Sequence, residues 1–375
     1  MPSRRKGPKI VISGYFGFDN NGDEAILLAM IHCLKTLRPD ARIVVLSGEP
    51  ERTQDLYGVE AVDRWSPAAV SKALLRTALF ISGGGSLIQD VTSVKSAEYY
   101  LSVIWLASLL AKKTMVYCQG VGPLMNTKIR RKTAKILNHC DVLTVRDAQS
   151  AKLLKMLGVE KEIREACDPV MALSYEDVDR EEVREYLQEM NILDSTGRKR
   201  KPLLLVTLRC WEDNRHFAPI AELLDMQARG DWDVLLAPAQ FPADMEAIDK
   251  VGNLMRERLY CLGKNLTARQ YMALTSYADK VFSMRLHGLV FAMAMGVPML
   301  ALSYDPKVEA FMEQVDLDRY CLPFDAFDWE TAAFLLEEME TMPLDTLYKQ
   351  EERRRELHTL AWDTARRAVE MLKRT

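Results

Sequence analysis

The chain has 375 residues, too many for one ordinary hydrophobic core, and this length predicts two domains of fewer than about 200 residues each. Its 50 basic and 53 acidic residues give a net charge of −3, which argues against nucleic acid as the main partner, because tracking a phosphate backbone requires a clear basic excess. The seven cysteines form no C-x-x-C pair, which suits a reducing compartment, disfavours a structural zinc site and predicts small core residues.

The N-terminal stretch, residues 1–17, carries basic residues but only a short apolar run before its first glycines. It therefore lacks the hydrophobic region of a secretory signal. The most membrane-like stretch, residues 99–111, is shorter than the roughly 18 residues that a membrane span requires, and we interpret it as a buried helix. We expect a cytoplasmic protein.

Apolar runs that end in glycine or polar loops recur in the first half of the chain, with helical patterns such as Asp23 to Leu37 and Ala148 to Leu157 between them. The runs are "PKIVISG", "ARIVVLSG", "ALFISGGG", "TMVYCQGVGP", "DVLTVRD" and "KEIREACDP". Strands that alternate with helices predict a parallel sheet covered on both faces. The first half is therefore expected to be Rossmann-like.

A polar and then basic stretch, residues 175–202, is the best candidate for a linker. A second series of strands follows it, namely "PLLLVTLR", "WDVLLAPAQ", "ERLYCLG", "DKVFSMR" and "VPMLALSY". The last segment is one long helical pattern. We predict an α/β chain with two Rossmann-like, doubly wound domains, residues 1–195 and 196–345, and a C-terminal helix, residues 346–375, that can pack back on the N-terminal domain.

The first loop, "SGYFGFDNNGDEAIL", does not have the glycine spacing of a dinucleotide fingerprint. Open parallel sheets bind ligands beyond the carboxyl ends of their strands, so this loop is a candidate binding site. Its candidate residues are Asn20, Gly22, Asp23 and Glu24. A tight turn followed by acidic residues that favour a helix N-terminus explains the same residues without a ligand.

Three further loops of the first half carry candidates. Gly83, Gly84 and Gly85 expose backbone amides to an anion or a sugar, with Ser86 as a hydrogen-bond donor, although steric relief at a crowded interface also explains the glycines. Gln119 follows the next strand and is available for hydrogen bonding. Arg146 ends the run after that, where it is either a ligand contact or an ordinary surface arginine.

In the second half of the chain, the positions of the charged residues indicate a binding site more specifically. If residues 281–287 stay extended, Arg285 and His287 project from the same side of a strand end. The small residues Gly288, Ala292, Ala294 and Gly296 behind them let a helix press closely on the sheet, and its N-terminus beside an arginine is an anion site. Lys307, in the first turn of the next helix, opposes the helix dipole and so points weakly to an anion nearby. A capped helix end and a surface lysine are the simpler alternatives.

Five motifs in this order resemble the polysaccharide pyruvyltransferase family, most of all the bacterial secondary cell-wall polymer enzymes of the CsaB type. They are "GYFGFDNNGDEAIL", "ISGGGSLIQD", "YCQGVGPL", "TVRD" and "MRLHGLVFAMAMGVPMLALSYDPKV". The resemblance implies a GT-B-like architecture with the active site between two domains. The N-terminal domain would be the acceptor side and the C-terminal domain the phosphoenolpyruvate side. The first loop departs from the commoner family pattern at Asp19.

Carried over by position, the resemblance makes Arg285, Leu286, His287 and Gly288 the family's R-L-H signature with the glycine after it, and Lys307 and Arg146 its other functional cations. It also implies phosphoenolpyruvate as donor and a lipid-linked disaccharide ending in N-acetylmannosamine as acceptor. Phosphoenolpyruvate carries a phosphate and a carboxylate, so its site needs at least two cationic groups, which Arg285, Lys307 and the helix N-terminus can supply.

Ketal formation also requires proton transfer, and histidine is the side chain best suited to this near neutral pH. We therefore expect His287 to be the general acid and base, with Arg146 reaching in from the other domain. The main alternative is a GT-B glycosyltransferase that uses a nucleotide sugar, since the fold does not decide the function. A glycan-binding module without catalysis is the alternative from a different class.

We expect no cofactor and no required metal, because no acidic or histidine cluster has the spacing of metal ligands. A basic helix in residues 126–137 predicts peripheral, salt-sensitive contact with the inner membrane face. Its cations are Lys128, Arg130, Arg131, Lys132 and Lys135, and Ile129 and Ile136 are expected to dip into the headgroups. A solvated helix face is the alternative.

Overall fold

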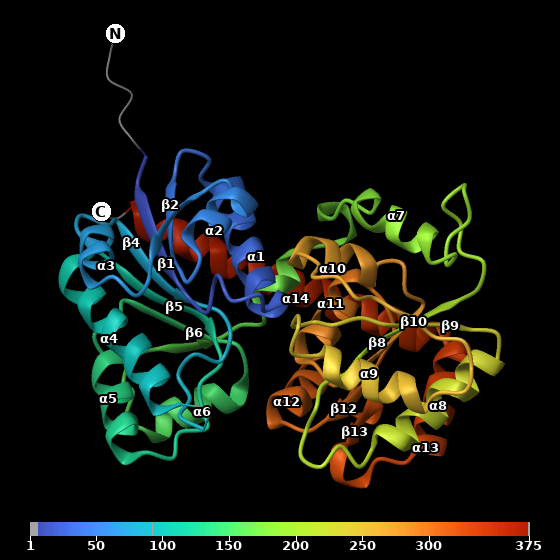
Figure 1. The fold of residues 1–375 in the computed structure, drawn as a ribbon. Helices are drawn as coiled ribbons and strands as arrows, with labels where there is room; N and C mark the ends of the chain where they lie inside the picture. Colours follow the sequence, from blue (N-terminus) through green and yellow to red (C-terminus); the bar gives the residue numbers. More distant parts are fainter. Residues whose placement is uncertain (1–6, 92, 374–375) are drawn as a thin grey trace. The chain divides into compact units, whose positions relative to one another are not determined.

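The computed structural model describes residues 7–91 and 93–373 (Figure 1). The chain divides into two compact units. Unit 1 comprises Met1–Phe18, Asp23–Ala172 and Leu357–Thr375, and unit 2 comprises Asp19–Gly22 and Leu173–Glu356. Residues 1–6, on which the expectation about the N-terminus partly rests, lie outside the described residues. Within the described ranges, no helix is both long and apolar enough to cross a membrane.

Unit 1 contains a parallel sheet of seven strands in the order β3-β2-β1-β4-β5-β6-β7. The strands are β1 (Lys9–Ser13), β2 (Arg42–Ser47), β3 (Glu60–Asp63), β4 (Leu79–Gly83), β5 (Thr114–Gln119), β6 (Val142–Val145) and β7 (Ile163–Glu165). The helices are α1 (Asn21–Leu37), α2 (Pro50–Tyr57), α3 (Pro67–Leu74), α4 (Val94–Leu110), α5 (Thr127–Leu137), α6 (Ala148–Met156) and the 3-10 helix η1 (Pro169–Ala172). Helices lie on both faces of the sheet, so its central strands are buried and apolar (Figure 1).

Unit 2 contains a second parallel sheet, of six strands in the order β10-β9-β8-β11-β12-β13. The strands are β8 (Leu203–Thr207), β9 (Asp233–Leu236), β10 (Tyr260–Cys261), β11 (Lys280–Ser283), β12 (Met299–Ser303) and β13 (Cys321–Pro323). The α-helices are α7 (Glu181–Glu189), α8 (Phe217–Arg229), α9 (Met245–Leu254), α10 (Ala268–Thr275), α11 (Leu286–Met295), α12 (Pro306–Gln314) and α13 (Trp329–Glu338). Single 3-10 turns complete it, η2 (Tyr175–Asp177), η3 (Asp318–Tyr320), η4 (Phe324–Ala326) and η5 (Met339–Thr341).

The last helix, α14 (Leu344–Lys373), begins in unit 2 and belongs to unit 1 from Leu357 onward. Its second part is fixed within unit 1, because the indole Nε1 of Trp362 donates to the carbonyl of Ala172 at 3.1 Å and the thiol of Cys167 donates to the carbonyl of Leu357 at 3.2 Å. The expected division at 195/196 and 345/346 stays a prediction about independently folding domains.

Each sheet reverses its strand order at one place. In unit 1 the reversal lies between β1 and β4, and in unit 2 between β8 and β11. Ligands of open α/β sheets bind outside the carboxyl ends of the strands at such a point. The loops after these strands are therefore the positions that matter for function in each unit.

Several expectations from the sequence are wrong in part. Residues 175–202 do not form an open linker but fold within unit 2, where α7 buries Val183 and Leu187. Residues 99–110 belong to α4 and Ala111 is its C-cap residue. The helix is buried on one face only and leaves Trp105 and Leu109 exposed, because it covers the outside of the sheet. Among the cysteines, which form no disulfide, Cys261 is exposed and Cys210 and Cys321 are half-buried, so only the other four are core residues.

The prediction for the basic helix α5 also needs correction. Ile129 is fully buried in the core of unit 1 and Ile136 packs against that core, so these two side chains are not available to enter lipid headgroups. The cations point outward because the apolar positions of this amphipathic helix face the sheet. Among them Lys132 pairs with Glu98 at 2.7 Å. Salt-sensitive membrane contact through the cations stays a prediction.

Close packing of α11 on the sheet depends on Gly288, as its small residues suggested. A Cβ atom at this position would lie 2.4 Å from the Oγ of Ser283 in β11. Such a distance is too short for any contact between these atoms, so a larger residue would push α11 away from the strand that it follows.

We predict that Gly288→Ala lowers the free energy of unfolding by about 1–3 kcal/mol, the usual effect of overpacking a core. Urea denaturation measures it. The matched control is Gly263→Ala, because a Cβ atom there would have no described atom within 4 Å. This control is expected to stay within about 0.5 kcal/mol of the parent chain. Equal stability of the two variants would contradict the close packing of α11.

Candidate functional site

Three cationic side chains follow three neighbouring strands of unit 2. Arg209 lies just after β8, Arg285 just after β11 and Lys307 in the first turn of α12, after β12. The sheet order places β8, β11 and β12 side by side, so all three cations belong to one region of its carboxyl edge. Arg209 was not predicted from the sequence, although it carries the same signal as Arg285, an arginine directly after an apolar strand.

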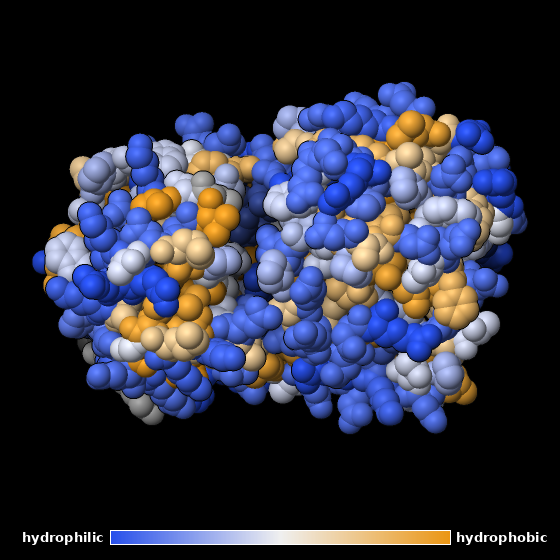
Figure 2. Space-filling model, turned by 90° about the horizontal axis from the view of Figure 1, so that it is seen from below, coloured by the Kyte–Doolittle hydropathy of each residue, from blue (hydrophilic) through white to orange (hydrophobic). Residues whose placement is uncertain are grey.

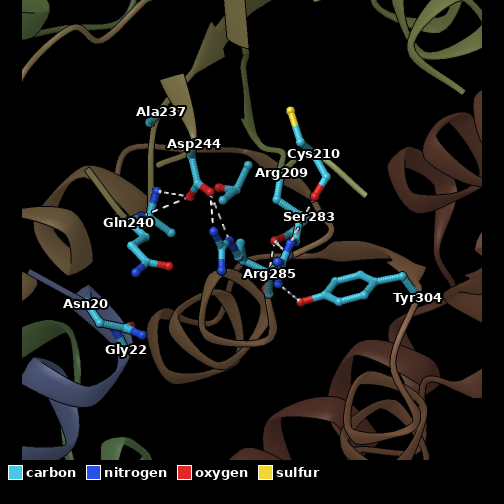
Figure 3. A network of polar contacts seen from close by, with 12 residues as sticks. Asn20, Gly22, Arg209, Cys210, Ala237, Gln240, Asp244, Ser283, Arg285 and Tyr304 are labelled. Atoms are coloured by element: carbon cyan, nitrogen blue, oxygen red, sulfur yellow. Dashed lines mark hydrogen bonds and ion pairs between the residues drawn. The ribbon is translucent and has the colours of Figure 1, made fainter. Parts of the chain in front are cut away.

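A buried carboxylate holds Arg285 in place (Figure 3). The Nε of Arg285 donates to Oδ1 of Asp244 at 3.1 Å, and its Nη2 pairs with the same oxygen. The other oxygen of Asp244 accepts the amides of Ala239 and Gln240, at 3.1 and 2.9 Å. Asp244 is 0% exposed, whereas the side chain of Arg285 keeps 17% of its surface exposed. Arg285 is thus both fixed and accessible, as an anion-binding arginine must be.

The backbone at Arg285 and His287 differs from the expected extended strand. β11 ends at Ser283 and α11 begins at Leu286, so Arg285 is the N-cap residue and His287 lies in the first helical turn. The Oγ of Ser283 closes this turn, since it accepts the amide of Arg285 at 3.0 Å and donates to the carbonyl of Arg285 at 2.8 Å. The inference that alternation along a strand puts Arg285 and His287 on one side is therefore wrong.

The first loop of the chain packs on His287 within unit 2. Asn20 forms a β-bridge with Gln240, and the amide of Asn21 donates to the carbonyl of Ala239 at 3.3 Å. A Cβ atom at Gly22 would lie 2.0 Å from Nδ1 of His287, so only glycine allows the imidazole to approach this closely. The predicted residues Asn20, Gly22 and His287 are thus brought together, and Figure 3 shows Asn20 and Gly22 facing the region of Gln240.

An aromatic side chain orders the other two cations. Nη1 of Arg209 donates to the hydroxyl of Tyr304 at 2.8 Å (Figure 3). Its guanidinium lies 4.8 Å from the ring centroid of Tyr304 and 5.3 Å from that of Trp211, the range of cation–π contacts. Nζ of Lys307 lies 3.0 Å from a carboxylate oxygen of Asp305 and 6.0 Å from the Tyr304 ring. Tyr304 therefore connects the ends of β8 and β12.

Two predicted contacts of this region are core residues. Leu286, the first residue of α11, and Gly288 are both buried, and a ligand could meet them only through their backbone. Behind the site, Thr207 and Tyr271 share a hydrogen bond of 2.6 Å. Burial raises the pKa of Tyr271, so its phenol stays protonated near neutral pH.

The candidates of unit 1 gather at the carboxyl ends of β4, β5 and β6. Arg146 is buried, and its Nη2 donates to Oγ of Ser86 at 3.2 Å. Its guanidinium also lies 3.7 Å from carboxylate oxygens of Asp147 and of Asp168, which is fully buried. This position excludes the alternative of an ordinary surface arginine. Asp168 was missed because "CDPV" carries no pattern that separates an ion-pair partner from a turn residue.

Gln119 lies next to Arg146 in the sheet, since the amide of Arg146 donates to the carbonyl of Gln119 at 3.2 Å. The Gln119 side chain is 0% exposed, and within the described residues its amide group has no hydrogen-bond partner. A Cβ atom at the adjacent Gly120 would lie 2.9 Å from Nη2 of Arg146 and 2.8 Å from Oγ of Ser86. A side chain at position 120 would therefore collide with Arg146 and Ser86, and only glycine lets the backbone lie this close to them.

The glycine run and the acidic pair of the first loop shape the same edge of unit 1. Gly84 and Gly85 have φ angles of 70° and 68°, where glycine is favoured, and the adjacent Gly83 ends β4. A Cβ atom at Gly85 would lie 2.6 Å from Oδ1 of Asp23. Glu24 accepts the amide of Gly17 at 2.7 Å and the Tyr57 hydroxyl at 2.6 Å, and so it fixes the loop after β1.

A family model decides which group of proteins the chain is related to. The model for polysaccharide pyruvyl transferases matches residues 20–306, which include the first loop and the helix start at Arg285 and His287. The chain belongs to the polysaccharide pyruvyl transferase family. No curated protein matches the sequence. The family therefore supports a transferase that acts in polysaccharide pyruvylation.

Solved structures with a similar fold belong to other sugar-related proteins. A glycosyltransferase from Rickettsia africae is 12% identical, with 98% of each chain covered and a TM-score of 0.65. UDP-GlcNAc 2-epimerase from Neisseria meningitidis is also 12% identical, with 98% of this chain and 100% of that chain covered and a TM-score of 0.62. ADP-heptose heptosyltransferase II from E. coli is 15% identical, with 92% and 99% covered and a TM-score of 0.50. These likenesses confirm the α/β, GT-B-like fold of two Rossmann-like sheets.

We predict that Asp244→Ala lowers the free energy of unfolding by about 3–5 kcal/mol, because it leaves the cation of Arg285 and two loop amides without their acceptor. Chemical denaturation measures this. The control is Glu246→Ala, which removes an exposed carboxylate paired with Lys250 at 2.6 Å on the same helix and is expected to leave the stability almost unchanged, because solvent screens the pair. If both variants are equally stable, Asp244 does not hold Arg285 in place.

Proposed function

We propose that this chain transfers a pyruvyl group from phosphoenolpyruvate to an N-acetylmannosamine residue of a lipid-linked cell-wall polysaccharide precursor, where it forms a ketal. One observation carries the proposal. The part of the chain that matches the family includes Arg209 and Arg285, two of the three cations that follow neighbouring strands, and also the N-terminus of α11, where Arg285 is the N-cap and His287 lies in the first turn. The reaction uses phosphoenolpyruvate as a co-substrate and, as proposed, requires no metal ion.

The donor fits the charge of this region. Phosphoenolpyruvate presents a phosphate and a carboxylate on a small carbon frame, so two anionic groups must be met at a short separation. Arg285, held by Asp244 but still accessible, offers a planar fork to one of them. Arg209 and Lys307, from the flanking strands, and the N-terminus of α11 are the further positive groups for the other.

The chemistry needs a group that moves protons. In the proposed reaction the methylene carbon of phosphoenolpyruvate takes a proton, and the adjacent carbon accepts the oxygen of one sugar hydroxyl. Phosphate then leaves with the bonding electron pair, and the oxygen of a second hydroxyl takes its place on that carbon. The two hydroxyl protons must be removed and one proton supplied, and we assign this exchange to His287. The packing of His287 against Gly22 holds the imidazole in one position.

Unit 1 supplies the groups that we propose for the acceptor. Arg146, Ser86 and Gln119 lie together at its carboxyl edge, and both arginine and amide groups bind the oxygens of sugars. We propose that Arg146 belongs to the catalytic residues and that Ser86, Gln119 and the glycine run contact the acceptor.

A glycosyltransferase that uses a nucleotide sugar is the second candidate, because the fold is shared with a glycosyltransferase and with an epimerase whose structure is described as bound to UDP-GlcNAc. Thermal unfolding separates the two functions. Phosphoenolpyruvate raises the melting temperature if the proposal is right, because a ligand stabilises the state that binds it, and UDP does not. The opposite pattern would favour the nucleotide sugar.

We predict that His287→Gln lowers turnover by about a hundredfold or more, the usual contribution of a general acid and base. The assay is phosphate release from phosphoenolpyruvate with a synthetic lipid acceptor that ends in N-acetylmannosamine. The control is His139→Gln, which changes an exposed histidine in unit 1 and is expected to leave turnover unchanged. A near-normal rate for the His287 variant would return this residue to a packing role.

We also predict that Arg285→Lys raises the Michaelis constant for phosphoenolpyruvate, by roughly tenfold or more, because the charge remains while the bidentate fork is lost. Steady-state kinetics with varied donor measures it. The matched change Arg229→Lys alters an arginine that is 63% exposed and should have no effect. An unchanged constant for the donor in the Arg285 variant would exclude a direct contact.

A further inference from the structure

A buried arginine in unit 1 lies among four aromatic rings. Arg64, directly after β3, is 4% exposed, and its guanidinium carbon lies 4.5 Å from the ring centroid of Tyr99. The centroids of Phe18, Trp65 and Tyr100 lie at 5.2, 5.1 and 5.2 Å. Nη1 of Arg64 donates to the carbonyl of Gly14 at 2.7 Å. The cation is therefore enclosed and serves as the centre around which these rings are ordered.

The rings also contact one another. Tyr15 stacks on Phe18 with centroids 4.3 Å apart, and Trp65 lies 5.6 Å from Tyr99 and 6.4 Å from Phe18. We call these five residues the aromatic cluster: Tyr15, Phe18, Trp65, Tyr99 and Tyr100. Within the aromatic cluster Tyr100 is buried, whereas Trp65 is 62% exposed and Tyr15 is 37% exposed. Two large rings thus face solvent on a floor that is fixed from below.

Exposure alone does not single out this cluster, because hydrophobic residues appear in several places among hydrophilic ones on the surfaces of both units (Figure 2). Its position does. The cluster combines the loops after β1 and β3 with the helix α4 that follows β4, and the strand order of the sheet reverses between β1 and β4. The rings therefore lie at the edge where open α/β sheets bind ligands.

The chemistry of the cluster suits a neutral ring better than an anion. The charge of Arg64 is enclosed and already meets a carbonyl, so it is poorly placed to bind a phosphate. Burial raises the pKa of Tyr15 and of Tyr99, and the cation of Arg64 opposes this at both rings. The carboxylate of Asp23 acts in the raising direction on the pKa of Tyr15, and the carboxylate of Asp63 does so on that of Tyr99. The two carboxylates offset the charge of Arg64, so the cluster has no excess of positive charge that would attract a nucleoside diphosphate. A pyranose ring has an apolar C–H face that packs on an aromatic ring, and hydroxyl groups that donate to carboxylates.

We propose that Trp65 and Tyr15 form a stacking platform for a pyranose ring of the glycan acceptor. The inference rests on the proposed function, which makes a glycan the acceptor, and adds a binding surface to it. Trp and Tyr side chains offer a large contact area at a low cost in conformational entropy, and the floor around Arg64 reduces that cost further.

Binding of a soluble acceptor tests the platform without catalysis. Calorimetric titration of the full chain with a synthetic disaccharide ending in N-acetylmannosamine, without phosphoenolpyruvate, is expected to give about tenfold weaker binding for Trp65→Ala than for the parent chain. Trp65→Phe, which keeps a ring, should recover most of the affinity. The matched control is Trp105→Ala, which removes another half-exposed tryptophan of unit 1 and should bind as the parent chain does. Melting temperatures check that each variant is folded.

The outcomes separate the platform from the proposed function. Equal disaccharide affinity in the parent chain and in Trp65→Ala overturns the platform, even if phosphate release with the acceptor continues. Binding of UDP that depends on Trp65, without binding of the disaccharide, overturns it as well. Disaccharide binding that depends on Trp65 supports the platform, and if phosphoenolpyruvate is then not consumed, the proposed pyruvyl transfer fails instead.

Discussion

The ion pair between Arg285 and Asp244 is the interaction on which the candidate donor site depends. Removing one partner of a buried pair costs more than the pair itself contributes, because the remaining charge stays in a medium of low polarity. Asp244 also accepts two amides of the loop after β9, and this loop bonds to residues 20 and 21. One carboxylate thus sets the positions of an arginine, a strand-end loop and the turn that packs on His287.

Unit 1 uses the same device at its own carboxyl edge. Arg146 lies near the fully buried carboxylate of Asp168 and donates to Ser86, so its guanidinium is held by neighbours in the loops that follow β7 and β4. A rigid arginine loses little entropy when it binds an oxygen-rich ligand, and the small residues around it let the ligand approach the backbone. Both units therefore position a cation by burying an acid behind it, and their sheets share the same strand order apart from one additional edge strand, β7, in unit 1.

The central strands were predictable, because a short apolar run that ends at a glycine is compatible with few structures other than a buried strand. The strands β3 and β13 were not, since they lie at sheet edges, are half-exposed and are short, and "EAVD" has no apolar run. The motif residues Arg285, His287 and Gly22 were identified from the sequence, but their arrangement was not. Whether "SMRLH" continues a strand or starts a helix depends on Ser283, and the partner Asp244 is 41 residues away in the sequence.

The segment Asp19–Gly22 belongs by its contacts to unit 2, while the residues on both sides of it belong to unit 1. A fragment that starts at residue 173 therefore lacks the turn that covers His287, however well its sheet folds. The same holds for hybrids between related chains. If the first 172 residues of one chain are joined to the remainder of another, the turn at residues 19–22 comes from one protein and the histidine that it packs against comes from the other. The halves of this chain are not exchangeable modules, and the first loop has to be inherited together with the helix that it meets.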